Sequence, residues 1–138
     1  MRELKKFVSV VCVIAGLFFV NAYAQPPTVY TEQNLNILVT AQNPQFQIKL
    51  KSNPTTGYSW FLREYDANLI QPMQHEFQAP QNKKLMGAPG YEVWSFVVKP
   101  AAFSVPQQTS IHMVYARPWQ TQDETTQLVF KVSTSAGQ

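Results

Sequence analysis

A chain of 138 residues is long enough for one folded domain with its own core, and it is short for two domains of ordinary size. Its only cysteine, Cys12, excludes a disulfide framework, and it leaves the chain after that position without a thiol nucleophile or a thiolate metal ligand. The net charge is +3, but after residue 24 the chain has no basic cluster larger than Lys83 and Lys84, so we expect no nucleic-acid partner.

The start of the chain has the three parts of a secretory signal peptide. It opens with basic residues, continues with an apolar run over residues 7–20, and ends with the small residues Ala22 and Ala24 at a cleavage site. The run of about 14 residues is shorter than the roughly 20 that span a bilayer, which argues against a retained anchor. We therefore expect residues 1–24 to be a signal peptide, and residues 25–138 to be a single exported domain, periplasmic or secreted, with no membrane attachment.

Removal of this leader would make the protein nearly neutral. Residues 1–24 carry three of the 11 basic residues and one of the eight acidic residues. The basic character of the full sequence therefore does not indicate an anionic partner.

Several segments alternate apolar and polar residues with a period of two, which is the pattern of a half-buried strand. A weaker segment of the same kind runs through Met73, His75 and Phe77. In chain order, the apolar positions of the clear segments are Leu35, Ile37, Val39; Phe46, Ile48, Leu50; Tyr58, Trp60, Leu62; Trp94, Phe96, Val98; Ile111, Met113, Tyr115; and Leu128, Phe130, Val132.

These segments predict an all-β protein. No window has helical spacing over three turns, and the 10 prolines would interrupt most helices. The predicted fold is an immunoglobulin-like antiparallel β-sandwich of about seven strands, with a small closed barrel as the alternative. We expect residues 100–108 to form a long connection, and residues 25–31 and 133–138 to be loose ends.

Three stiff turns lie between the strands, and we name them the first loop (residues 53–58), the second loop (87–90) and the third loop (117–119). Proline fixes one backbone angle and glycine permits turns that other residues avoid, so each loop should hold its shape. Successive loops are two strand-lengths apart, which in an antiparallel sandwich brings all three to one end. Their residues are Asn53, Pro54, Thr55, Thr56, Gly57 and Tyr58; Gly87, Ala88, Pro89 and Gly90; and Arg117, Pro118 and Trp119.

A purely structural interpretation explains part of this pattern. The glycines can serve only to turn the chain, and Trp119 can pack back onto the edge of the sandwich. A tight turn has no special need for the two adjacent β-branched residues Thr55 and Thr56, however. Their restricted side chains lower the entropy cost of binding, and a tryptophan beside a proline is placed to act as an interface anchor.

The ordered set of motifs over residues 39–132 resembles the chagasin family of reversible inhibitors of papain-like cysteine proteases. The motifs are the first loop, the second loop after Leu85 and Met86, the strand containing Trp94, and Tyr115 leading to the third loop. The resemblance implies an immunoglobulin-like β-sandwich that needs no cofactor or metal. It further implies that the three loops block the active-site cleft of a protease of papain or cathepsin L type.

The resemblance also implies a role for each loop. Thr55 and Thr56 would reach the catalytic cysteine and histidine, the second loop would contact one wall of the cleft, and Trp119, with Arg117 and Pro118 shaping its loop, would pack on the other. Two features depart from the family pattern: Pro89 stands where the best-known members have a second glycine, and the connection over residues 100–108 is longer than in compact members. The proline lacks a backbone N–H donor that the glycine would provide.

Little in the chain suggests an enzyme. It has two histidines, His75 and His112, no Gly-x-Ser-x-Gly motif, and scattered carboxylates, with Asp123 and Glu124 placed in a turn. We expect a monomer, because no long apolar stretch is left over for an obligate interface. The alternative from another class is a secreted adhesion or carbohydrate-binding module that uses Tyr58, Tyr91 and Trp119.

Overall fold

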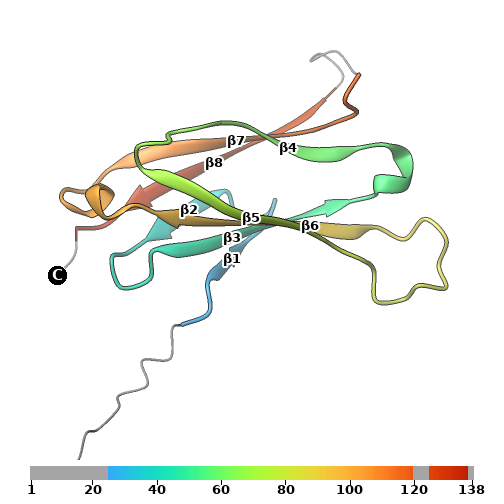
Figure 1. Cartoon of the computed structure of the whole chain (residues 1–138), viewed down its shortest axis with the longest axis horizontal. Helices are drawn as coiled ribbons and strands as arrows, with labels where there is room; N and C mark the ends of the chain where they lie inside the picture. Colours follow the sequence, from blue (N-terminus) through green and yellow to red (C-terminus); the bar gives the residue numbers. More distant parts are fainter. Residues whose placement is uncertain (1–24, 120–124, 137–138) are drawn as a thin grey trace, which may run out of the picture.

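The computed structural model describes residues 25–119 and 125–136, which form two four-stranded β-sheets packed face to face (Figure 1). The expected signal peptide, and the expected turn at Asp123 and Glu124, lie outside these residues. Within them, no helix has the length and apolar character needed to span a membrane. The elements are β1 (Thr28–Tyr30), β2 (Asn36–Val39), β3 (Gln45–Ser52), the short 3₁₀ helix η1 (Pro54–Thr56), β4 (Ser59–Tyr65), β5 (Ile70–Gln78), β6 (Gly90–Val98), the 3₁₀ helix η2 (Pro100–Phe103), β7 (Gln108–Ala116) and β8 (Thr126–Thr134).

The fold confirms the predicted β-sandwich of immunoglobulin-like type. One sheet has the strand order β1-β3-β6-β5 and the other β2-β8-β7-β4. Because the strands belong to two separate sheets, the alternative of a closed barrel is wrong. The central pairs are antiparallel, whereas the short edge strands β1 and β2 pair in parallel with β3 and β8.

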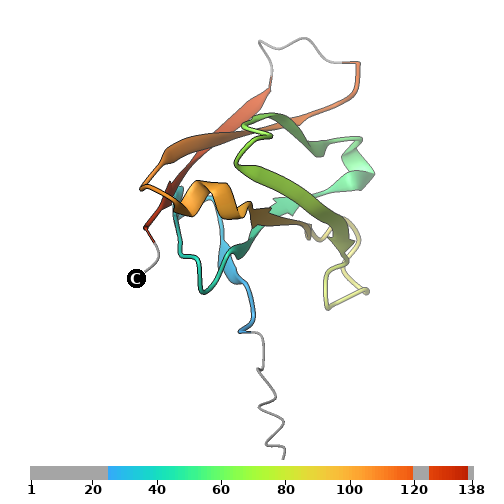
Figure 2. The ribbon, with the colours of Figure 1, turned by 60° about the vertical axis from the view of Figure 1, so that its left-hand side comes forward.

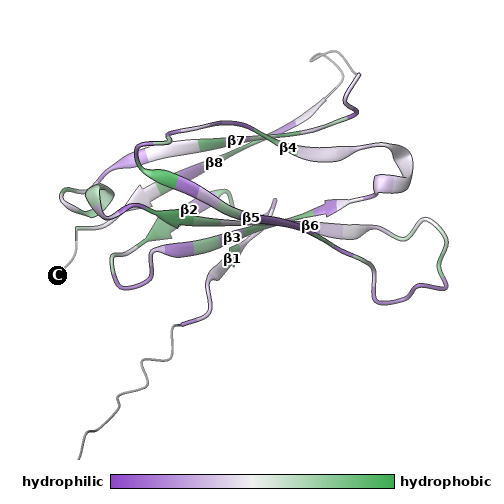
Figure 3. Cartoon of the chain, viewed as in Figure 1, coloured by the Kyte–Doolittle hydropathy of each residue, from purple (hydrophilic) through white to green (hydrophobic). Residues whose placement is uncertain are grey.

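The core lies between the sheets and follows the alternation in the sequence. Phe46, Ile48 and Leu50 of β3 are buried against Phe130 and Val132 of β8, together with the apolar positions of the other strands. Hydrophobic colouring gathers on the strands in Figure 3, while η1 is pale or hydrophilic. Burial of this apolar surface is the main force that holds a chain without disulfides together.

The two ends of the domain are more ordered than we predicted. Residues 28–30 form β1, and residues 133 and 134 continue β8. The reason at the first site is Tyr30, which is buried against Phe46. Its hydroxyl accepts the backbone N–H of Leu38 at 3.3 Å and lies at the same distance from the carbonyl oxygen of that residue, so it connects β1 of one sheet with β2 of the other.

The strand β5 is also longer than the weak alternation through Met73, His75 and Phe77 indicated. It covers nine residues and pairs with β6 over its whole length, with a change of register between Pro72 and Gln74. This bulge on an edge strand disturbs the regular alternation in the sequence, which explains the weak signal.

All three loops lie at one end of the sandwich, on the right in Figure 1. The end of β3 faces the start of β6, where Ser52 pairs with Gly90, and the start of β4 faces the end of β7, where Ser59 pairs with Ala116. The start of β1, the end of β8 and η2 lie at the opposite end; η2 is the orange coil beside the sandwich in Figure 2.

Candidate functional site

The first loop is a single turn of 3₁₀ helix held by its own side chains. Backbone N–H groups of Thr56 and Gly57 donate to the carbonyls of Asn53 and Pro54 at 3.1 and 3.0 Å. The hydroxyl of Thr55 bonds the side-chain oxygen of Asn53 at 2.6 Å, and the hydroxyl of Thr56 donates to the Asn53 carbonyl, also at 2.6 Å. Gly57 ends the turn at a φ of 81°, a left-handed conformation that favours glycine.

Both threonines therefore shape the loop as well as form its surface, which the sequence did not indicate. The turn uses both hydroxyls, while residues 54–57 stay exposed. An exposed loop with a fixed backbone and few free rotamers loses little entropy when it meets a partner.

The first loop is bonded to the second. The side-chain N–H of Asn53 donates to the carbonyl oxygen of Gly87 at 3.2 Å. Within the second loop, the N–H of Ala88 bonds the carbonyl of Leu85 at 3.2 Å, and Pro89 is exposed.

Gly90 differs from the other loop glycines because it is buried at the start of β6. A methyl group in place of its hydrogen would collide with the backbone carbonyl of Gln78 and the ring of Phe77. We predicted Gly90 to be a residue of the second loop, and its buried position shows that it allows β5 and β6 to approach each other.

The first loop is also bonded to the third. The Nε–H of Arg117 donates to the carbonyl of Thr56 at 3.0 Å, and the guanidinium lies 4.6 Å from the centre of the Tyr58 ring. The nearest atom of the Trp119 ring is 3.4 Å from the position that a methyl group on Gly57 would take. With 74% of its surface exposed, Trp119 lies against the first loop and is not folded back onto the sandwich.

An apolar groove of about 430 Å³ lies between the first two loops and is lined by residues of both. Leu85 and Met86, on its rim, are 62% and 99% exposed. In the sequence these two residues served only to locate the second loop, although adjacent apolar residues beside a glycine turn are themselves a sign of a contact surface. The groove is lined by Asn53, Pro54, Thr55, Phe77, Pro80, Lys83, Leu85, Met86, Gly87 and Ala88.

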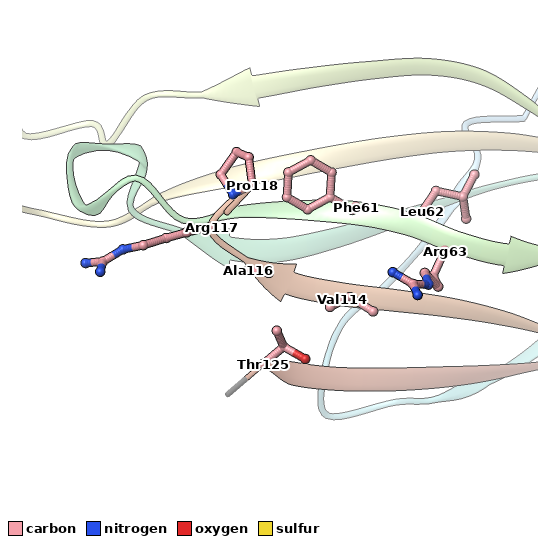
Figure 4. A pocket seen from close by; sticks show the side chains of 8 residues that line it. All are labelled: Phe61, Leu62, Arg63, Val114, Ala116, Arg117, Pro118 and Thr125. Atoms are coloured by element: carbon pink, nitrogen blue, oxygen red, sulfur yellow. The ribbon is translucent and has the colours of Figure 1, made fainter. Parts of the chain in front are cut away.

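A second hollow, of about 340 Å³, lies beside the third loop on the outer face of β4 and β7 (Figure 4). Pro118 and Phe61 lie next to each other at its rim, while Arg117 extends away from it toward the first loop. Within the third loop, Pro118 therefore faces the outer side of β4 and β7, whereas Arg117 reaches the first loop. Its lining consists of Phe61, Leu62, Arg63, Val114, Ala116, Arg117, Pro118 and Thr125.

Polar side chains of the sandwich form hydrogen bonds at the base of the first loop. The hydroxyl of Tyr115 accepts the backbone N–H of Asn53 at 3.0 Å, and its ring packs against those of Tyr58 and Trp60. Ser52 and Glu92 form a buried pair under the first loop at 2.6 Å.

Ser52 and Glu92 were not among the predicted site residues, but the alternation of the strands marks both of them. Ser52 is in phase with the buried residues of β3, and Glu92 is in phase with Phe96 and Val98 of β6. A polar residue at a core position of a strand implies a specific partner inside the fold.

The arrangement offers surface for binding rather than groups for catalysis. Among residues 25–119 and 125–136, no group of three or more His, Cys, Asp or Glu side chains could hold a metal ion. The His75 imidazole bonds the Glu92 carboxylate and stacks on the Trp94 ring. His112 lies on β7, where its Nδ1 atom is 3.9 Å from the Oε2 atom of Glu64. Both histidines lie outside the three loops.

Comparisons with known proteins agree with the loop motifs. The model of the chagasin family of peptidase inhibitors matches residues 40–133. Chagasin of Trypanosoma cruzi is 30% identical over 86 residues, which cover 59% of this chain and 73% of chagasin.

Two solved structures have a similar fold. The cysteine protease inhibitor from Entamoeba histolytica has a TM-score of 0.62 at 23% identity, and the match covers 79% of this chain and 94% of the inhibitor. Amebosin has a TM-score of 0.58 at 24% identity, over 82% of this chain and 99% of amebosin.

Proposed function

The chain belongs to the chagasin family of peptidase inhibitors, and from this premise we propose that it reversibly inhibits papain-like cysteine proteases by placing the three loops in their active-site cleft. As a member of an inhibitor family it is not an enzyme. The observation that supports the mechanism is that the loops are exposed and at the same time bonded to one another through Asn53 and Arg117.

Each loop has a part in this proposal. Thr55 and Thr56 enter the cleft beside the catalytic cysteine and histidine, where the short turn of η1 gives a narrow leading edge. The second loop contacts one wall of the cleft, and Trp119 packs on the other. No bond is made or broken, because the protein acts by excluding the substrate.

Preorganisation makes tight binding possible for an interface of this kind. Protease–inhibitor pairs bury about 1,600 Å² in total. Nanomolar affinity corresponds to roughly −12 kcal/mol, and a binding surface reaches that value when little is lost in ordering its loops. The hydrogen bonds within and between the loops reduce that loss here.

In the proposed complex, the second loop contacts the protease differently from a loop that has glycine at position 89. Pro89 has no N–H, so this position donates no hydrogen bond to the backbone of a protease. We propose that the neighbouring apolar surface of Leu85 and Met86 makes the main contact on this side.

The proposal also covers the cellular location of the protein and its oligomeric state. Residues 1–24 direct export and are removed, and residues 25–138 act as a monomeric domain in the periplasm or outside the cell. The partner is a protease of papain or cathepsin L type.

The geometry does not favour the carbohydrate-binding alternative. Tyr58 is covered by Tyr115 on one side and by the Arg117 guanidinium. Tyr91 lies on β6 under the amine of Lys49 at 4.6 Å. Neither ring therefore forms an open platform with Trp119 for stacking on a sugar.

The test is a titration of papain and of a cathepsin L-type protease with residues 25–138, in which the wild type is compared with the double variant T55A/T56A. We expect nanomolar, reversible inhibition that the double variant weakens by at least about tenfold, since it loses contacts at the centre of the interface and the bonds to Asn53. The matched control is T28A, an exposed threonine at the opposite end of the sandwich, which should inhibit like the wild type. Failure of the wild type to inhibit either protease at micromolar concentration would contradict the proposal.

A further inference from the structure

The first loop has an unusual base, because its two ends lie in different sheets. It begins after Ser52, the last residue of β3, and it ends at Ser59, the first residue of β4. β3 and β4 belong to separate sheets, so they form no ladder of backbone hydrogen bonds with each other. In a β-hairpin such a ladder holds the two ends of the loop together. The first loop requires another connection.

Glu92 supplies that connection from a third strand. One of its carboxylate oxygens, Oε1, accepts the hydroxyl of Ser52 at 2.6 Å and the backbone N–H of Trp60 at 3.1 Å. A single oxygen atom thus bonds the residue that precedes the loop and a residue just after it. Glu92 faces the interior from β6 and is only 3% exposed.

The other carboxylate oxygen, Oε2, is held by His75 of β5. The distance to the His75 Nε2 atom is 2.8 Å, and the imidazole ring stacks on the Trp94 indole with 3.9 Å between ring centres. All three partners of Glu92 can donate a hydrogen bond, which suits an ionised carboxylate because that group only accepts. Bonds to a charged group are shorter and stronger than neutral ones.

A carboxylate in this position needs an explanation, since burying one is costly unless its partners are in place. An apolar residue at position 92 would fill the same space in the core without that cost. It would leave the Ser52 hydroxyl and the Trp60 N–H without their acceptor at the base of the first loop. The buried carboxylate of Glu92 therefore lies where its hydrogen bonds can fix the shape of the first loop.

We propose that Glu92 is a positioning residue that sets the separation of the two ends of the first loop and so holds Thr55 and Thr56 in their binding conformation. This inference rests on the proposed function for the identity of the partner. Two further bonds assist: the Trp60 indole N–H donates to the Lys51 carbonyl at 2.9 Å, and Tyr115 accepts from Asn53. Neither of these bonds reaches β5 or β6, whereas the carboxylate of Glu92 links both ends of the loop to β6 and, through His75, to β5.

The experiment compares Glu92→Ala, Glu92→Gln and Ser52→Ala in the protein produced from the complete sequence. Two quantities are measured: the inhibition constant against papain, and the hydrogen exchange rates of the Thr56 and Gly57 amides in the free protein. Glu92→Ala should raise the inhibition constant and both exchange rates by about tenfold or more, as expected for the loss of buried hydrogen bonds. Ser52→Ala should have a smaller effect in the same direction.

Glu92→Gln tests whether the bonds themselves matter. Glutamine keeps an oxygen for Ser52 and Trp60, and its amide group can donate to a neutral His75. We expect it to restore inhibition to within about threefold of the wild type, which corresponds to less than 1 kcal/mol. A glutamine variant as weak as the alanine variant would overturn the positioning role.

The matched control is Thr134→Val, because Thr134 is a buried hydroxyl at the opposite end of the sandwich. Its Oγ1 donates to the carbonyl of Ala102 at 2.7 Å and accepts the N–H of Gln107 at 2.9 Å. This variant should lower the thermal midpoint as Ser52→Ala does, without changing the inhibition constant or the exchange at Thr56 and Gly57. Equal losses of inhibition in the two variants would show that Glu92 and Ser52 act only through general stability, and would overturn the inference.

The two measurements also separate this inference from the proposed function. A wild type that inhibits no papain-like protease contradicts the proposed function, and the exchange rates still decide the role of Glu92. Unchanged exchange at Thr56 and Gly57 in Glu92→Ala would overturn the positioning role even if the wild type inhibits papain.

Discussion

Trp119 is the loop residue with the most surface to offer a partner. Its side chain is largely exposed, and its ring lies against Gly57 of the first loop. An aromatic ring that stands beside a fixed turn gives a large contact area with few rotatable bonds. Binding by the third loop should therefore depend on this one side chain.

We predict that Trp119→Ala weakens protease inhibition by roughly 30- to 1,000-fold, or about 2–4 kcal/mol, as for other central aromatic anchors. The free energy of unfolding should change by less than about 1 kcal/mol, because the ring buries little surface in the free protein. Inhibition kinetics and urea unfolding measure the two effects.

Val105→Ala is a suitable control for this change, since it removes an exposed apolar side chain in the connection after η2, far from the loops. It should leave the inhibition constant as it is. If Trp119→Ala also leaves the constant unchanged, Trp119 is not part of the binding surface.

At the scale of the elements, the pairing of β5 with β6 depends on a residue without a side chain. Gly90 pairs with Ser52 of β3, and the Gln78 carbonyl oxygen of β5 occupies the place that a Cβ atom on Gly90 would need. The second loop connects these two strands, so its shape follows from how they meet.

We predict that Gly90→Ala destabilises the domain by about 1–3 kcal/mol, because the added methyl group overpacks the contact between β5 and β6 and backbone has to move. Urea unfolding should show a lower midpoint, and the amides at the end of β5 should exchange faster. A variant as stable as the wild type would show that the two strands can separate at this point without cost.

The sequence predicted most strands well, including the edge strands β2 and β4, and it was weak only at β1 and β5, the two edges of one sheet. Alternation marks a strand that has one buried face, as in β3 and β8, where every second side chain enters the core. The strand β1 has three residues and buries only Tyr30, too little for a period to show. Parallel pairing of β1 and β2 leaves no local turn signal, because the partners are far apart in the chain.

The site could be predicted as far as its turns, and less well in its contacts. Proline, glycine and asparagine indicate where the chain turns, so the three loops were found from local chemistry. The bonds of Asn53 to Gly87 and of Arg117 to Thr56 join residues 34 and 61 positions apart, which no local pattern reveals. Gly90 was grouped with the turn residues of the second loop, because a glycine needed for close packing looks the same in sequence as one needed for a turn.

At the scale of the whole molecule, the three loops lie together at one end of the sandwich. The bonds between them make a single continuous edge rather than separate sites. The opposite end is closed by η2, whose Ala102 is completely buried. If the loops bind a protease as proposed, this asymmetry provides one binding site in each copy of the chain.

We predict a monomer that forms a complex of one chain with one protease. Light scattering coupled to gel filtration should give the mass of a single domain for residues 25–138, and the sum of one inhibitor and one protease for the mixture. A complex with two proteases would mean that a second surface binds, and a free dimer would contradict the monomeric state.

The direction of the outer strands has a practical consequence. Thr28 pairs with Phe46 at the start of β3, and Thr134 pairs with Val39 at the end of β2, so the described chain enters and leaves at the end away from the loops. A label, an affinity tag or a sensor surface attached near residue 25 or residue 136 would therefore point the three loops outward into solution. Immobilised through either position, the protein should capture its target as well as it does when free.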